Sequence, residues 1–146
     1  MVKIRVATRD DLDAVLAVNR AAAIRAYAPI FGDLPYPEAA VRSRYERLLA
    51  EADVRLFIAE DRMNAVGYAA ARPGRLEALY VIPGQWGAGI ADRLYERAAE
   101  VAGPGATLWV LRDNTRGRRF WERRGWRATG EEKPGAATEC LYRRCR

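Results

Sequence analysis

Two glycines precede a helical pattern near the middle of the chain and indicate a place where an anion can bind. The stretch "YVIPGQWGAGIADRLYERAAEVAG" (residues 80–103) begins as a strand, breaks at "PG" and passes through Gly87 and Gly89 into a helix. The first amides of a helix have no partner inside it and carry the positive end of its dipole. Without side chains at the glycines, an anion can approach several of these amides. The alternative is that the glycines only permit a tight turn.

Two better-known phosphate loops do not fit this stretch. A P-loop requires Lys followed by Ser or Thr after its last glycine, where this chain has Ile90 and Ala91. A dinucleotide-binding fingerprint requires Gly or Ala three residues after its second glycine, where this chain has Asp92. The sequence therefore argues against a nucleoside triphosphatase and against a dinucleotide-binding domain.

The composition excludes several kinds of catalysis. The chain has no histidine, which removes Ser-His-Asp and Cys-His nucleophile systems and most zinc and iron sites, so we expect no metal. Cys140 and Cys145 lie five residues apart, so on one strand they would face opposite sides, and we expect both to be reduced. The net charge of +6 suits a phosphate-bearing partner, although arginine content also follows genome base composition.

Length and hydropathy favour one domain over residues 1–146. The longest apolar run, "VGYAAA", is far too short to span a bilayer, which takes about 20 residues. The opening "MVKIRVATRDDL" lacks the apolar core of a signal peptide. We therefore expect a cytoplasmic protein that does not contact membranes.

The hydrophobic periodicity predicts an α/β chain with one central, mostly antiparallel sheet and helices on both faces. Thr8 caps a first helix, whose inward face includes Leu12, Val15, Leu16, Ile24 and Tyr27, and residues 28–37 form a loop. The other predicted helices cover residues 37–52, 87–102 and 114–124. The predicted strands cover residues 3–7, 54–60, 65–72, 75–82, 106–112, 126–132 and 138–144.

Two segments of the chain, one after the other, resemble the sequence motifs of the GNAT (GCN5-related N-acetyltransferase) superfamily. The segment "WGAGIA" is similar to its pyrophosphate loop, in which Gln or Arg precedes Gly-x-Gly-x-Gly/Ala; Trp86 stands in the Gln/Arg position. The segment "NTRGRRFWERRGW" resembles its second motif, Asn-x-x-Ala-x-x-Phe-Tyr-x-x-x-Gly-Phe. The opening "IRVATRDDLDAVLAVN" is similar to the family's first strand and helix, so the resemblance covers nearly the whole chain.

This resemblance implies a GNAT-type domain whose sheet of about seven strands is splayed in the middle. It also implies acetyl-CoA as co-substrate, without a metal, and direct transfer of the acetyl group to a primary amine of a small molecule or a peptide or protein. The coenzyme A pantetheine arm is expected to lie along the strand before the loop, and the pyrophosphate on the loop itself. The implied cofactor-binding residues are Leu79, Tyr80, Val81, Trp86, Gly87, Ala88, Gly89, Ile90, Ala91, Asp92, Arg93, Asn114, Gly117, Phe120 and Trp121.

The catalytic groups are less clear from the sequence. In the family a tyrosine after the motif's phenylalanine commonly protonates the thiolate, but here that residue is Trp121, whose indole N–H has no useful acidity. For the base we name Glu77, two residues before Leu79 and so expected on the same face as Leu79 and Val81. The alternative is that Glu77 is solvated or ion-paired. The amide of Val81 is a candidate donor to the thioester oxygen.

The acceptor side is predicted from the loop after the first helix. Tyr27, Phe31 and Tyr36 are candidates for an aromatic wall that binds the substrate, and the alternative is that they belong to the core. Two rival functions remain open: a non-catalytic acyl-CoA-binding module, and a basic domain associated with nucleic acid. Of these functions we expect the acetyltransferase. We also expect that it binds no nucleic acid and that it is a monomer or a homodimer.

Overall fold

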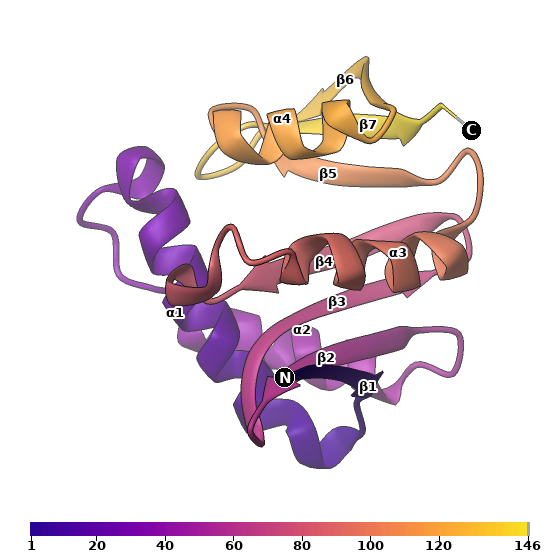
Figure 1. The fold of residues 1–146 in the computed structure, drawn as a ribbon. Helices are drawn as coiled ribbons and strands as arrows, with labels where there is room; N and C mark the ends of the chain where they lie inside the picture. The colour runs from indigo at the N-terminus through magenta and orange to yellow at the C-terminus, as the bar shows by residue number, and fades with distance from the viewer. Residues whose placement is uncertain (146) are drawn as a thin grey trace.

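The seven strands lie in one sheet in the order β1-β2-β3-β4-β5-β7-β6 in the computed structural model, which describes residues 1–145 (Figure 1). Every neighbouring pair is antiparallel except β4 and β5, which are parallel. The sheet therefore confirms the expected mixed and mostly antiparallel architecture. The strands are β1 (Val2–Val6), β2 (Arg55–Asp61), β3 (Asn64–Arg72), β4 (Arg75–Val81), β5 (Thr107–Leu111), β6 (Trp126–Lys133) and β7 (Glu139–Arg144).

Helices cover both faces of the sheet, as the sequence predicts. In Figure 1, α3 and α4 lie in front of the sheet, and α1 and α2 lie behind it. Two short 3₁₀ helices, η1 and η2, precede α1 and the glycine loop. Their bounds are η1 (Arg9–Asp11), α1 (Leu12–Phe31), α2 (Glu38–Ala50), η2 (Pro83–Gln85), α3 (Ile90–Ala102) and α4 (Thr115–Arg123).

Each face of the sheet has its own apolar core. On the α3 and α4 side, Leu94 of α3 and Trp126 of β6 are fully buried in one cluster. On the α1 and α2 side, Val15, Tyr45 and Ile58 are fully buried in another. Because strand side chains alternate between the faces, both clusters draw on the same strands and bury the sheet between them.

Strands β4 and β5 touch at one end only. Their pairing consists of Arg75 with Thr107, at the first residue of each strand. Past that pair the two strands part, so the edge of β4 that faces β5 has no strand partner near its carboxyl end. The expected splay is present, and it lies next to the glycine loop that follows β4.

The first helix differs from the sequence-based prediction. It continues through Pro29 to Phe31, whereas a loop was expected from Ala28. Proline has no backbone N–H, so one helical hydrogen bond is missing at Pro29, close to the end of the helix. The helix ends two residues later, where Gly32 adopts a φ of +58°. The expectation that Ile24 faces inward was wrong, because this side chain is 48% exposed.

Within residues 1–145, no helix is long and apolar enough to cross a membrane, and no cluster of His, Cys, Asp and Glu could hold a metal ion. The two cysteines are free, as expected: Cys140 is buried and Cys145 is exposed.

Candidate functional site

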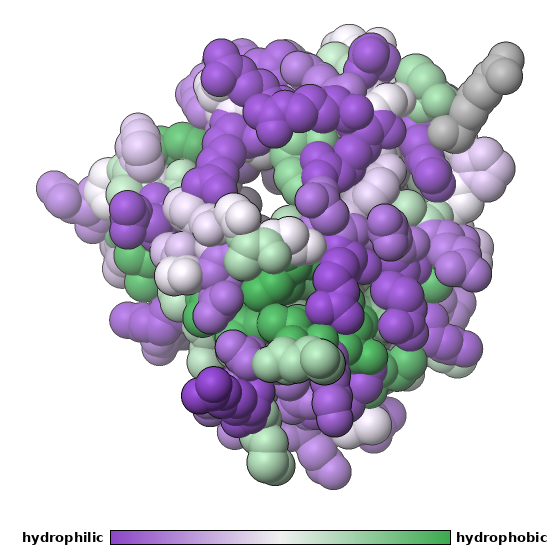
Figure 2. Space-filling model, in the orientation of Figure 1, coloured by the Kyte–Doolittle hydropathy of each residue, from purple (hydrophilic) through white to green (hydrophobic). Residues whose placement is uncertain are grey.

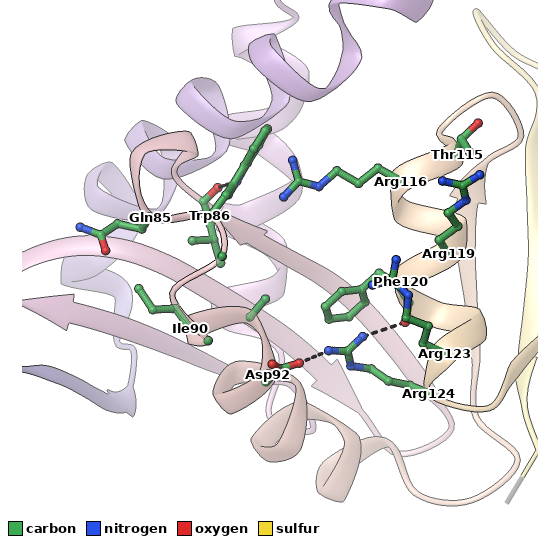
Figure 3. A pocket seen from close by; sticks show the side chains of 14 residues that line it. Gln85, Trp86, Ile90, Asp92, Thr115, Arg116, Arg119, Phe120, Arg123 and Arg124 are labelled. Carbon is green, nitrogen blue, oxygen red and sulfur yellow. Dashed lines mark hydrogen bonds and ion pairs between the residues drawn. The ribbon is translucent and has the colours of Figure 1, made fainter.

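A cavity of about 760 Å³ lies between the glycine loop and α4. This volume falls within the range of about 300–1,000 Å³ that is usual for ligand sites. Figure 2 shows the same side of the molecule, where hydrophilic side chains gather over α4 above a hollow. The lining residues are Val81, Gln85, Trp86, Gly87, Gly89, Ile90, Ala91, Asp92, Thr115, Arg116, Arg119, Phe120, Arg123 and Arg124 (Figure 3).

The loop side of the cavity presents bare backbone. Gly87 and Gly89 have φ of +85° and +83°, and a Cβ built on either would meet no atom within 4 Å. The first backbone bond of α3 runs from the Arg93 amide to the Gly89 carbonyl, so the amides of Ile90, Ala91 and Asp92 have no partner in the helix. The glycines therefore serve the turn and also leave open space beside these amides, and binding of an anion there stays a prediction.

The β4 edge provides further backbone groups. The Ile82 amide bonds the Val66 carbonyl of β3 at 2.9 Å, so by the alternation of an antiparallel ladder the groups of Val81 and Leu79 point away from β3. They face the gap left by β5. The same alternation turns the backbone of Tyr80 toward β3. The expectation that the pantetheine arm meets the backbone of Tyr80 was therefore wrong.

Trp86 occupies part of that edge. Its indole Nε1 donates a hydrogen bond of 2.7 Å to the Val81 carbonyl. On the other side of the cavity, the Arg116 guanidinium carbon lies 3.8 Å from the centre of the Trp86 ring, and Figure 3 shows this arginine reaching across from α4. The residue in the family's Gln/Arg position thus contacts both walls of the cavity.

A second contact between the walls joins α3 to α4. Asp92 accepts a hydrogen bond from Arg124 in an ion pair (Figure 3). The Arg124 guanidinium also lies 3.5 Å over the Phe120 ring, and its partial burial lowers its pKa. Asp92 is the only carboxylate among the lining residues.

Asn114 and Gly117 begin α4 rather than line the cavity. The Asn114 side chain accepts a hydrogen bond of 3.1 Å from the Gly117 amide, which caps the helix. A Cβ at Gly117 would clash with the Asn114 side chain as it lies here, so any larger residue would require that side chain to shift. The Asn114 and Gly117 positions of the motif therefore have a structural role, which is to cap the start of α4.

Trp121 is part of the core. It is 8% exposed, and its ring lies 4.8 Å from that of Phe120 and 5.8 Å from that of Trp126. Trp121 is not among the residues that line the cavity, so it packs behind Phe120 and supports that wall.

Glu77 does not share the face of Leu79 and Val81, and that part of the prediction was wrong. The register between β3 and β4 shifts here: Ala70 pairs with Ala78, and the next residue, Ala71, pairs with Leu76. Glu77 is therefore the extra residue of a β-bulge, which breaks the alternation of side chains.

The bulge gives the Glu77 carboxylate two arginine partners. Arg72 Nε donates to it at 2.8 Å, and Arg44 of α2 approaches it to 3.8 Å. Arg72 also pairs with Glu51 at 2.5 Å. The carboxylate thus lies in an ion-pair network on the α2 side of the sheet, which is the alternative that the sequence left open. Its role as a base stays a prediction.

The predicted acceptor residues come together around a tyrosine network. The hydroxyls of Tyr27 and Tyr80 lie 3.0 Å apart, and the rings of Tyr27 and Phe31 meet edge to face at 6.1 Å. Tyr36 donates to Asn19, a buried polar residue that in turn donates to the Tyr68 hydroxyl at 2.8 Å. Burial raises the pKa of Tyr36 to about 12.

Most residues on the loop side of the cavity were predicted from the sequence, and few on the α4 side were. Ala88 and Arg93 belong to the predicted set and are not lining residues, and neither are Leu79, Tyr80, Asn114, Gly117 and Trp121. Gln85, Thr115, Arg116, Arg119, Arg123 and Arg124 line the cavity without having been named as site residues. The signal for the arginines was their helical spacing after Asn114.

Comparison with known proteins agrees with this fold. The sequence matches the model of the acetyltransferase (GNAT) family over residues 16–126. The chain belongs to the GNAT family of acetyltransferases. No curated protein sequence matches it.

Solved structures of acetyltransferases share the fold over almost the whole chain. The PaiA N-acetyltransferase of Thermoplasma acidophilum, in complex with coenzyme A, superposes with a TM-score of 0.76 at 19% identity, over 97% of this chain and 98% of that one. A GCN5-related N-acetyltransferase of Rhodopseudomonas palustris gives a TM-score of 0.80 at 17% identity, over 99% and 95% of the two chains. The ribosomal-protein-S18-alanine N-acetyltransferase of Escherichia coli gives 0.72 at 14% identity, over 99% and 93%.

Proposed function

We propose that this protein is an acetyl-CoA-dependent N-acetyltransferase that acts on a primary amine of a small molecule or of a peptide or protein. The observation that carries the proposal is the glycine loop at the start of α3, which faces a cavity beside the parted strands β4 and β5. That combination offers unpaired amides for a pyrophosphate and an open strand edge for an amide-containing arm.

The residues present fit coenzyme A. The pyrophosphate would accept from the amides at the start of α3, each charge-assisted bond contributing roughly 1.5–3 kcal/mol. The pantetheine amides would bond the gap-facing groups of Leu79 and Val81, and at the Val81 carbonyl they would share or replace the hydrogen bond from the Trp86 indole. We keep as proposed cofactor-binding residues Leu79, Tyr80, Val81, Trp86, Gly87, Ala88, Gly89, Ile90, Ala91, Asp92, Arg93, Asn114, Gly117, Phe120 and Trp121. The last three belong to α4, and they contribute by shaping the wall of the cavity.

The reaction is direct attack in a ternary complex. The neutral amine nitrogen attacks the acyl carbon, the C–N bond forms, the C–S bond breaks, and the thiolate takes up a proton as the amine loses one. The Val81 amide, which faces the gap, is positioned on β4 to donate to the thioester oxygen as negative charge develops there.

Two carboxylates are candidate acceptors for the amine proton, and both are already ion-paired. Asp92 is held by Arg124, and the Glu77 carboxylate is held by Arg72 and Arg44 on the opposite side of the sheet. We therefore propose that the amine attacks in its neutral form and that its nitrogen, cationic once the C–N bond forms, gives its proton to solvent, with Glu77 as the alternative base.

We place the acceptor on the α1 and α2 side of the gap. Tyr27, Phe31 and Tyr36 form the proposed aromatic wall there, and Tyr80 connects this wall to β4 through its hydrogen bond with Tyr27. An aromatic wall of this kind can receive the apolar part of an amine while the amine nitrogen enters the gap.

A substitution series at Gly89 tests the cofactor site. Gly89→Asp places a negative charge where the pyrophosphate would lie, and we expect calorimetry to show acetyl-CoA affinity at least about tenfold weaker. Gly89→Asn has nearly the same shape without the charge and tolerates a positive φ, so its loss should be smaller. Equal affinity of all three proteins, with the fold intact by circular dichroism, would remove the loop from the site.

The alternative is a non-catalytic acyl-CoA-binding module, and two observations favour it. Trp121 replaces the tyrosine of the family motif, and the lining of the cavity offers no carboxylate except the ion-paired Asp92. Acetyl-CoA binding without turnover on a broad panel of amines would support this alternative, and turnover on any of them would exclude it.

A further inference from the structure

Three arginines on one side of α4 face the cavity and make this wall positively charged. Arg116, Arg119 and Arg123 follow one another at spacings of three and four residues, which places them on one side of the helix. All three are exposed, and all three line the cavity opposite the glycine loop (Figure 3).

These arginines differ in what they contact. Arg116 lies over the Trp86 ring, and Arg124, one residue beyond the helix, pairs with Asp92. Arg118 points elsewhere and donates to the Tyr142 hydroxyl at 2.8 Å. Within residues 1–145, no carboxylate lies within ion-pair distance of Arg119 or Arg123, and neither guanidinium has a hydrogen-bond partner there.

An uncompensated pair of this kind is unfavourable on its own. Arg119 and Arg123 are four residues apart on one helix, and like charges at that spacing destabilise a helix. A multivalent anion in the cavity would remove this repulsion. Two guanidinium groups suit a phosphate in particular, because each presents a planar fork of donors that binds phosphate oxygens in pairs.

Coenzyme A carries two separate phosphate groups, and the loop accounts for only one. The unpaired amides at the start of α3 provide for the pyrophosphate. The adenosine end also bears a monophosphate on the ribose 3′ oxygen, and the opposite wall of the same cavity carries the two unpaired arginines. The chemistry of each wall thus matches one of the two groups.

We propose that Arg119 and Arg123 form a second anion subsite that binds the ribose 3′-phosphate and makes the protein select coenzyme A over dephospho-coenzyme A. This inference rests on the proposed function, since it takes coenzyme A as the occupant of the cavity. The two arginines are specificity determinants and touch no reacting atom.

Calorimetry with two ligands tests the inference. Coenzyme A and dephospho-coenzyme A differ only in the 3′-phosphate, so their ratio of dissociation constants isolates that group. We expect the wild-type protein to bind coenzyme A about tenfold or more tightly than dephospho-coenzyme A, the loss that one charge-assisted contact represents. In Arg119→Gln/Arg123→Gln the two ligands should bind alike, at the affinity of dephospho-coenzyme A for the wild type.

Arg47→Gln is the matched control. Arg47 is exposed on α2, on the far side of the sheet, and the substitution removes one arginine charge by the same exchange, so it should leave the ratio unchanged. In turnover with the acetylated ligands, the double variant should raise KM for acetyl-CoA only and leave kcat as in the wild type.

The possible failures are distinguishable. A wild type that binds both ligands equally well would overturn the 3′-phosphate subsite and leave the proposed function standing. A double variant that weakens both ligands by the same factor would show a general effect of charge and would also overturn the subsite. If the wild type binds neither ligand, the proposed function itself fails.

Discussion

Glu77 shows how one extra residue can redirect a side chain. The alternation of a regular strand places it with Leu79 and Val81, and the bulge at this position turns it to Arg72 and Arg44 instead. The sequence contains no signal for the bulge, because a bulge arises from the register between two strands and not from either strand alone.

We expect Glu77→Gln to act on stability more than on rate. Glutamine keeps the shape but loses the charge that Arg72 and Arg44 share, so the melting temperature should fall while kcat changes less than about tenfold. Differential scanning calorimetry and a pH–rate profile measure the two effects. A loss of about 10²-fold or more in kcat, together with loss of an ionisation from the profile, would show that Glu77 is the base after all.

Trp121 is predicted to matter through packing. Trp121→Phe keeps an aromatic ring against Phe120 and Trp126 and should retain most of the turnover. Trp121→Ala empties a buried site and should cost about 3–5 kcal/mol of unfolding free energy, measured by denaturant titration. Trp109→Phe, at a half-buried position of β5, is the control for loss of an indole. A hundredfold fall in kcat for Trp121→Phe with an unchanged KM would instead point to a chemical role.

At the scale of elements, the loop and α4 were predictable to different degrees. Gly87 and Gly89 are unusual where a helix should begin, so the loop was visible in the sequence, although the helix itself starts later, at Ile90. The α4 wall gave only a weak signal, the helical spacing of its arginines, because arginines on a helix are ordinarily solvated. Only the fold shows that Arg116, Arg119 and Arg123 face the loop across a cavity.

The contact between α3 and α4 gives a prediction about charge. Asp92 lies in the first turn of α3, beside the proposed pyrophosphate site, and Arg124 neutralises it. Arg124→Gln should weaken coenzyme A binding about two- to fivefold by leaving that carboxylate uncompensated, and Asp92→Asn should strengthen binding by a similar factor. The double variant should return close to the wild-type affinity.

Calorimetry on the four proteins measures these changes in affinity, and Glu96→Gln is the control. Glu96 is an exposed acid on the same helix, one turn further on, and is not among the lining residues. If Arg124→Gln binds coenzyme A as tightly as the wild type, or if Asp92→Asn does not bind it more tightly, the charge of Asp92 does not act on the ligand and the prediction is wrong.

For the whole molecule, the order of strands and helices followed from the sequence, and the position of the buried polar groups did not. Periodicity and turn residues predicted seven strands and four helices close to their observed bounds. Asn19 gave no signal of its own, and only the fold shows it buried between Tyr36 and Tyr68. Such networks depend on which elements pack together, which a pattern along one chain does not encode.

The buried tyrosines predict instability at alkaline pH. Burial raises the pKa of Tyr27, Tyr45 and Tyr68 above the ordinary value of about 10. Above pH 10 the unfolded chain therefore binds fewer protons than the folded one, so the free energy of unfolding falls as pH rises through that value. Melting temperatures should be nearly constant between about pH 7 and 9 and decline beyond about 10.

Tyr45→Phe checks the origin of that decline. The variant removes one buried phenol, so its stability should fall less steeply with pH than that of the wild type, whatever its stability at neutral pH. Ultraviolet absorbance of tyrosinate, followed with far-ultraviolet circular dichroism, should show these phenols ionising together with unfolding. Ionisation well before unfolding would mean that they are accessible in the folded protein.

The parting of β4 and β5 divides the sheet into a block of β1–β4 and a block of β5–β7 that share one residue pair. A pantetheine arm bonded along β4 would act as a removable eighth strand at this seam. The co-substrate then serves as a structural component, and at 100 times its dissociation constant it would add about 2.7 kcal/mol to the unfolding free energy. Resistance to proteolysis at the seam would accordingly rise and fall with the supply of coenzyme A.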